Sequence, residues 1–301
     1  MYLAVVTSLG KGNEVNACPC RPLIKHCTIC NGRGSWMGYS KGKSVQVLGM
    51  LRIADDGEVE SLALAHKPRT VLAMLVAHPD QVVSLPALVR ELWGDHPPAS
   101  ALRVVQTYIL QARKALSQAT RLPIKVIIQE ALTTHAGGYM FSESFARLDY
   151  RIYQGLVDSG RKALANGDLS AGVSYLGDAL GIWRGSAFAD VVVGRMLESR
   201  RRQYEESRLG ALETLAEAKI EIGRHLEVTA DLAALTTEYP YHEGLHSQYM
   251  RALEKAGRRA QALEVFHRLR VGLVSELGIE PGHTISRLQY SILNSSPVNG
   301  V

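Results

Sequence analysis

The feature that most constrains this chain is a stretch of 34 residues, 96–129, that contains no Asp or Glu. The surrounding region is balanced in charge, because residues 45–149 hold ten Lys or Arg and ten Asp or Glu. Cations gathered on one element, away from carboxylates, are what a polyanion-binding surface requires. The cations of the stretch are Arg103, Arg113, Lys114, Arg121 and Lys125.

The apolar spacing in this stretch predicts an amphipathic helix over residues 100–118. Its predicted buried stripe is Leu102, Val105, Ile109, Ala112 and Leu116. At about 100° per residue, the opposite face groups polar and basic side chains that contact phosphates and base edges in other proteins. An ordinary amphipathic helix can also have a basic solvated face. The choice between this interpretation and DNA binding therefore depends on the neighbouring elements. The predicted opposite face is Arg103, Thr107, Gln111, Lys114 and Gln118, with Leu110 among them and Arg113 nearer the edge.

Length and composition predict a two-domain globular protein, since 301 residues exceed the size of most single cores and 46% are hydrophobic. The longest apolar run, residues 71–77, is too short to cross a bilayer. The first nine residues lack the cationic flank of a signal peptide. We therefore expect a cytoplasmic location and no membrane partner.

The basic charge of the chain is concentrated at its start. Residues 1–44 hold six Lys or Arg against Glu14 alone, which accounts for the whole formal net charge of +5. The expected first segment, residues 1–43, is a basic extension that contains all four cysteines, Cys18, Cys20, Cys27 and Cys30. Four thiolates could bind zinc in a tetrahedral site, and His26 could replace one of them.

Two alternatives to a zinc site stay open for this extension. Its Gly, Asn, Ser and Lys content is typical of a flexible tail, or the segment could result from a start codon placed too early. The first cysteine pair is Cys-x-Cys rather than the commoner Cys-x-x-Cys. A cytosolic setting disfavours disulfides. We expect no cofactor, with zinc in the extension as the open exception.

The elements around the basic helix predict a winged helix over residues 44–145. Two β-rich runs, 44–53 and 58–64, precede a helix over 67–77. Ser84 is a good N-cap for a second helix that closes at Trp93-Gly94, and Pro97-Pro98 then lead into the basic helix. After it come the β-branched run 124–128 and a hairpin, the wing, over 131–142 with a turn at 136–138. In a winged helix, the third helix enters the major groove and the hairpin lies along the neighbouring backbone.

At this point the sequence resembles the OmpR-type winged helix of the Streptomyces antibiotic regulatory proteins. The resemblance implies phosphate contacts by Arg103 and Tyr108, support of a backbone contact by the Trp93 indole N–H, and a place on the wing for Tyr139. The motifs are Val83-Ser84, Leu88, Glu91-Leu92-Trp93-Gly94, Pro97-Pro98, Ala101-Leu102-Arg103, Val105-Gln106-Thr107-Tyr108, Arg113-Lys114-Ala115-Leu116 and Gly138-Tyr139.

The residues expected to contact DNA lie on the three predicted helices and the wing. One departure from the family pattern is Gln111, where an arginine is usual, followed by Ala112 where a leucine is usual. Glutamine pairs with adenine and arginine with guanine, so the preferred base at that step should differ. The full predicted set is Lys67, Trp93, Arg103, Gln106, Thr107, Tyr108, Gln111, Arg113, Lys114, Thr134 and Tyr139.

Residues 149–293 are predicted to be helical, followed by a tail over 294–301. Polar breaks at 166–168, 223–225 and 257–259 separate the helices, and Gly223 and Gly257 are 34 residues apart, the tetratricopeptide period. Stacked helix pairs bind proteins on their concave side, although a purely packing or dimerising role stays open. This half resembles the bacterial transcriptional activation domain, on the motifs Ala179-Leu180-Gly181-Ile182-Trp183-Arg184-Gly185, Ala256-Gly257-Arg258, Ala262-Leu263, Arg268-Leu269-Arg270 and Glu276-Leu277-Gly278-Ile279-Glu280-Pro281-Gly282.

A second basic cluster, Arg195, Arg200, Arg201 and Arg202, invites another nucleic-acid interpretation. Glu198, Glu205 and Glu206 are at helical spacing beside it, so the sequence favours a salt-bridged solvated face.

Searches for catalytic motifs are negative, and we expect no enzyme. The sequence contains no Gly-x-x-x-x-Gly-Lys-Ser/Thr loop, which the appended ATPase module of larger family members would carry, and no His-Glu-x-x-His or Gly-x-Ser-x-Gly. The first 44 residues are too few for a phosphoacceptor receiver domain, so we expect none.

The sequence therefore predicts a mainly α protein with small β elements, a winged helix-turn-helix followed by an all-α tetratricopeptide-like domain. The resemblance implies a transcriptional activator of an antibiotic gene cluster that binds direct repeats in double-stranded promoter DNA as a dimer and recruits RNA polymerase holoenzyme. Two alternatives remain open: a protein-interaction scaffold that uses the repeat domain, and a regulator gated by zinc or redox chemistry.

Overall fold

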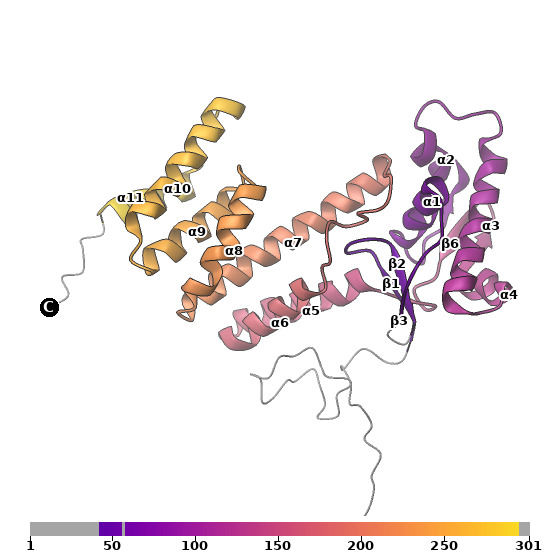
Figure 1. Cartoon of the computed structure of the whole chain (residues 1–301), viewed down its shortest axis with the longest axis horizontal. Coiled ribbons are helices and arrows are strands. Elements are labelled where there is room, and N and C mark those ends of the chain that lie inside the picture. Colours follow the sequence, from indigo (N-terminus) through magenta and orange to yellow (C-terminus); the bar gives the residue numbers. More distant parts are fainter. Residues whose placement is uncertain (1–41, 56–57, 295–301) are drawn as a thin grey trace, which may run out of the picture. The chain divides into compact units, whose positions relative to one another are not determined.

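The computed structural model describes residues 42–55 and 58–294, and its fold class is the predicted one (Figure 1). Short strands alternate with helices in the N-terminal half, and helices alone make up residues 149–294 apart from their connections. No helix in these ranges is long and apolar enough to cross a membrane. The first half contains β1 (Ser44–Gln46), β2 (Arg52–Asp55), β3 (Glu58–Ser61), α1 (His66–Val76), β4 (Val83–Ser84), α2 (Leu85–Trp93), α3 (Ala101–Thr120), α4 (Ile124–Val126), the π-helix η1 (Ile127–Ala131), β5 (Leu132–His135), β6 (Gly138–Phe141) and β7 (Arg147–Leu148).

Two small sheets frame the three helices of this half. The first has the order β3-β2-β1-β7, antiparallel except for the parallel pair of β1 and β7, in which Val45 faces Leu148. The second has the order β4-β6-β5, with Val83 opposite Tyr139. β5 and β6 form the predicted hairpin, and its turn contains Gly137 at φ +81°, a conformation that favours glycine. The wing is therefore attached to the helices through β4.

Local sequence signals explain the helix boundaries of this half. The Ser84 hydroxyl accepts a hydrogen bond from the Ala87 N–H at 3.3 Å, which caps α2 as expected. Gly94 at φ +61° ends that helix. Arg121, in the left-handed conformation at φ +55°, ends α3 two residues beyond the predicted boundary.

Three expectations from the sequence were wrong. The predicted strand over 44–53 is two strands, because Gly49 at φ +145° turns the chain between them. The β-branched run 124–128 is helical, and it places Ile127 in the core while Ile124 and Ile128 are each 37% exposed. Leu102 is 55% exposed, and the buried stripe of α3 begins instead at Ala101.

The second half consists of helix pairs joined by repeated turns. Gly167, Gly223 and Gly257 all have φ between +73° and +81°. Each is followed by a residue whose N–H bonds a carbonyl five positions back, at 2.8 to 2.9 Å. The recurrence of this turn after 34 residues confirms the predicted repeat. The helices are α5 (Asp149–Ala165), α6 (Leu169–Gly181), α7 (Arg195–Glu221), α8 (His225–Glu238), α9 (Glu243–Lys255), α10 (Arg259–Gly272), the π-helix η2 (Leu273–Leu277) and α11 (His283–Asn294).

The segment between α6 and α7, residues 182–194, is a connection of turns and bends that returns to the first sheet, which the prediction of continuous helix missed. The N–H groups of Arg184 and Phe188 donate to the carbonyls of Leu48 and Val47, each at 2.9 Å. The Asp190 carboxylate accepts from the Leu51 N–H at 2.7 Å and pairs with Arg69 of α1. One hydrophobic core therefore runs from β1 into α7.

Two buried carboxylates complete this junction. Asp149, at the start of α5, accepts from the N–H groups of Val47 and Leu48 at 2.9 and 3.2 Å and pairs with Arg184. Burial raises the pKa of Asp149, while the backbone donors and Arg184 act in the opposite direction. Glu91 of α2 is 7% exposed and accepts from three N–H groups at the start of α7, those of Gly194, Met196 and Leu197, at 2.7 to 3.1 Å.

The contact between α2 and α7 also explains the glycine before α7. A Cβ at Gly194 would lie 2.3 Å from the carbonyl oxygen of Glu91. Glu91 thus satisfies the N–H groups that the first turn of a helix leaves without partners, and its charge complements the helix dipole.

Candidate DNA-binding surface

The solvent-facing side of α3 is polar and basic except for two exposed leucines, and it carries no carboxylate. Of the predicted contact residues, Arg103, Gln106, Thr107, Gln111 and Lys114 are all exposed on it. The Thr107 hydroxyl donates to the Arg103 carbonyl at 3.2 Å, within the helix. The buried side is apolar, from Ala101 through Val105 and Ile109 to Leu116, and fixes the rotation of α3 about its axis. We call the exposed set the α3 surface.

The α3 surface also has two apolar members, of which Leu110 was expected on this face and Leu102 was expected in the buried stripe. Leu102 is 55% and Leu110 44% exposed, and both lie among the polar side chains. Apolar side chains on such a surface can contact thymine methyl groups. The available signal was Ala101, which continues the buried spacing of Val105 and Ile109 and so leaves Leu102 outside the stripe.

An aromatic and cationic column links the three helices beside this surface. The Lys67 ammonium of α1 lies 4.8 Å from the centroid of the Trp93 ring of α2. Trp93 stacks in turn with Tyr108 of α3, with ring centroids 6.4 Å apart and planes at 20°. Lys67 is exposed, and the two aromatic side chains are half-buried. Three of the predicted contact residues are thus held together by cation–π and stacking contacts.

The wing is joined to α3 by Arg113. Its guanidinium donates twice to the Leu132 carbonyl, at 3.0 and 2.7 Å, and once to the Thr134 hydroxyl at 2.8 Å. It also lies 5.7 Å from the Tyr139 ring centroid. Burial lowers the pKa of Arg113 and the neighbouring Tyr139 raises it, yet an arginine keeps its charge at physiological pH. Three predicted contact residues therefore meet here.

The exposure of these three residues differs. Thr134 is exposed on β5, Arg113 is half-buried, and Tyr139 on β6 is only 8% exposed. Tyr139 therefore packs in the hairpin, and Arg113 uses its donors to fix the distance between wing and helix. Sequence reasoning gave neither of these structural roles.

The wing also depends on a glycine. A Cβ at Gly138 would lie 2.3 Å from the Val83 carbonyl oxygen, so only glycine lets β6 approach β4 this closely.

The second basic cluster is mostly the salt-bridged face that the sequence favoured. Glu198 pairs with Arg201 at 2.6 Å and with Arg202 at 3.0 Å, and these arginines lower the pKa of its carboxyl group. Arg195 and Arg200 have no ion pair in the described part of the chain.

The predicted zinc ligands, Cys18, Cys20, Cys27 and Cys30, lie outside the described residues. Within residues 42–55 and 58–294, no group of three or more His, Cys, Asp or Glu is arranged to hold a metal ion.

The fold and the α3 surface define a class of protein, a winged-helix transcriptional regulator. Residues 59–141 match the family model of the C-terminal domain of transcriptional regulatory proteins, and residues 148–293 match the bacterial transcriptional activator domain.

Similar proteins are also named as regulators. Regulatory protein DnrI of Streptomyces peucetius is 39% identical over 253 residues, which is 84% of this chain and 93% of DnrI. AfsR of Streptomyces griseus is 32% identical over 83% of this chain, which spans 24% of AfsR. A structure of Mycobacterium tuberculosis EmbR in complex with a low-affinity phosphopeptide has a TM-score of 0.75 and 31% identity, and covers 86% of this chain and 67% of that one.

The chain belongs to the Streptomyces antibiotic regulatory protein family. It is a regulator of transcription and not an enzyme.

Proposed function

We propose that the chain activates an antibiotic-biosynthesis gene cluster in the cytoplasm by binding promoter DNA through α3 and the wing. The observation that carries the proposal is the α3 surface, which exposes Arg103, Gln111 and Lys114 with no carboxylate among them. α3 lies in the major groove, and β5 and β6 follow the neighbouring backbone. The 39% identity with DnrI, over nearly the whole of that protein, supports this role.

Individual residues have separate tasks in the proposal. Arg103 and Tyr108 contact phosphates, and Lys67 and Trp93 support that contact from α1 and α2. Gln106, Thr107, Gln111 and Lys114 face the groove, where Gln111 reads adenine. From the wing, Thr134 reaches the backbone directly. Arg113 and Tyr139 act from behind, because their hydrogen bonds and packing set where the wing lies.

Two partners complete the proposal. Two copies bind direct repeats about one DNA turn apart, which seats both on the same side of the duplex. The helical half then contacts RNA polymerase holoenzyme, and shared tethering on the DNA strengthens contacts that are weak in solution. The match of residues 148–293 to the bacterial transcriptional activator domain supports a role of this half in activation.

A mobility-shift titration of the full chain against promoter fragments, across a salt series, tests DNA binding. Arg103→Ala should weaken binding to every sequence and reduce the slope of log affinity against log salt by about 0.9, the value for one lost phosphate contact. Arg202→Ala, which removes one positive charge from α7, is the matched control. Failure of the unaltered chain to shift any fragment of its own gene cluster would leave the scaffold alternative.

The partner proposals have their own test. Purified polymerase holoenzyme should further retard the complex formed on a fragment with two repeats. Insertion of five base pairs between the repeats places the two copies on opposite sides of the duplex. The fragment with the insertion should then lose cooperative binding, and equal cooperativity on both fragments would rule out the proposed dimer.

A further inference from the structure

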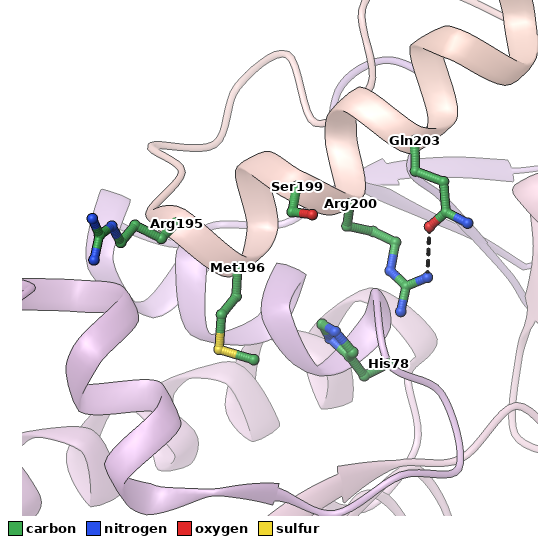
Figure 2. Close-up of a pocket in the computed structure, with 6 residues that line it drawn as sticks. All are labelled: His78, Arg195, Met196, Ser199, Arg200 and Gln203. Atoms are coloured by element: carbon green, nitrogen blue, oxygen red, sulfur yellow. Dashed lines mark hydrogen bonds between the residues drawn. The ribbon is translucent and has the colours of Figure 1, made fainter.

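A hollow of about 460 Å³ lies between the turn after α1 and the first turns of α7 (Figure 2). This volume is in the range of sites for small molecules, about 300 to 1,000 Å³. His78 contributes from the turn after α1, and all other lining residues come from one side of α7. The lining residues are His78, Arg195, Met196, Ser199, Arg200 and Gln203.

The side chains around this hollow form a cationic site without a counter-ion. The Arg200 guanidinium lies near the His78 ring, whereas the Arg195 side chain points away from both (Figure 2). Arg200 donates to the Gln203 side-chain oxygen at 2.9 Å, which holds the guanidinium in place. The Nδ1 atom of His78 lies 2.8 Å from the Met74 carbonyl oxygen, so this nitrogen donates. The other nitrogen donates to a phosphoryl oxygen when the ring is doubly protonated, and accepts from a P–OH group when it is not.

The charge of the hollow is unbalanced because the nearest glutamate on α7 is engaged elsewhere. Glu198 pairs with Arg201 and Arg202, and no carboxylate lines the hollow. Among the described residues, neither Arg195 nor Arg200 forms an ion pair. A guanidinium binds phosphoryl oxygens through two parallel hydrogen bonds, and the Ser199 hydroxyl and the His78 ring offer further contacts.

We propose that this hollow binds a small organic phosphate, with its phosphoryl group between Arg200 and His78 and the rest of the molecule against Met196. The hollow is distinct from the α3 surface, because none of its residues belongs to α3 or to the wing. Such a ligand would bridge the winged helix and α7, which Glu91 already joins. Because it binds the folded chain alone, it would raise the melting temperature.

Calorimetric titration of the full chain tests the proposal, with ribose 5-phosphate, AMP, inorganic phosphate, adenosine and citrate as probes. We expect saturable binding of at least one phosphate ester, with adenosine inactive and citrate weaker. Arg200→Gln should weaken the binding by about tenfold or more, as expected for a lost hydrogen bond between charged groups. Arg202→Gln is the matched control, because it removes the same charge from α7 outside the hollow.

A second variant keeps the test valid if Arg200→Gln fails to fold. Ser199 is exposed, and Ser199→Glu places a carboxylate beside Arg200, so this variant should lose binding while it melts at the temperature of the unaltered chain. The proposal is overturned if no phosphate ester saturates, if citrate binds as tightly as the esters, or if Arg202→Gln weakens binding as much as Arg200→Gln. Stoichiometric displacement of the ester by any DNA duplex would also overturn it, since the hollow would then belong to the DNA surface.

Discussion

Charged side chains have different environments on two sides of the winged helix. On the α3 surface, Arg103 and Lys114 face solvent and no carboxylate accompanies them. Toward the helical half, Glu91, Asp149 and Asp190 are placed where backbone N–H groups and arginines need acceptors. Two of these three junction acids, Glu91 and Asp149, belong to the ten acids of residues 45–149, and Asp190 comes from the connection before α7.

The difference is that the junction carboxylates are engaged by nearby donors, whereas Arg103 and Lys114 form no ion pair among the described residues. Each carboxylate of the junction is hydrogen-bonded or ion-paired to several donors. These donors offset its negative charge, so the carboxylate adds little negative potential at the α3 surface. The two sides can also be changed separately: substitutions at the junction should act on stability, and substitutions on the α3 surface should act on DNA binding.

The largest effect is expected for Asp149→Ala, which leaves two buried N–H groups and the partner Arg184 without their acceptor. We expect the free energy of unfolding to fall by about 3 to 5 kcal/mol, as for other broken buried pairs. Urea denaturation followed by circular dichroism measures it. Asp158→Ala, at an exposed position of α5, is the control, and equal losses in the two variants would contradict a special role for Asp149.

Glu91→Ala tests the other end of the junction. Three N–H groups at the start of α7 lose their acceptor, and water can reach them only in part, so we expect a loss of about 2 to 4 kcal/mol. Hydrogen exchange should locate the loss, because the amides of Met196 and Leu197 would exchange faster. The exposed Glu206→Ala serves as the comparison. Unchanged exchange at the start of α7 would show that Glu91 does not cap it.

The α3 side of this comparison could be predicted from the sequence, but the junction could not. The stripe through Val105, Ile109 and Leu116 and the cap at Ser84 are local patterns, and the structure confirms them. The link between Glu91 and Gly194 joins residues 103 positions apart, and no periodicity reports such a contact. The same limit hid the non-helical connection over 182–194, whose backbone bonds Leu48 and Val47, more than 130 positions away.

Within the candidate site, the sequence predicted the members of the site. It did not predict the contacts that each member makes. Arg113 was expected near the edge of the basic face, and its bonds to Leu132 and Thr134 depend on where the wing packs. Leu102 fitted a helical stripe nearly as well as Ala101 does. A buried stripe that starts at Leu102 differs by one residue from one that starts at Ala101, and tertiary packing determines which of the two is buried.

On the α3 surface, Lys114→Glu should reduce affinity for all DNA by roughly 100-fold at low salt, because it removes a cation and adds repulsion of phosphates. The gel-shift affinity is the measurement. Arg202→Glu changes the net charge by the same amount on α7, where the arginine is exposed and paired with Glu198. A similar loss in both variants would mean that overall charge, and not the α3 surface, governs binding.

The smallest change in total affinity is expected for Gln111→Ala, which alters preference more than strength. If Gln111 makes a paired contact with adenine, its loss should cost about 1 to 3 kcal/mol of discrimination at one base pair and leave nonspecific binding nearly unchanged. Competition among fragments that differ at each position of the repeat measures this. Gln118→Ala lies two turns further along the same exposed side and should leave every preference intact. If both variants leave the same base preferences as the unaltered chain, then Gln111 does not read the groove, and the side of α3 nearest Arg103 must do so instead.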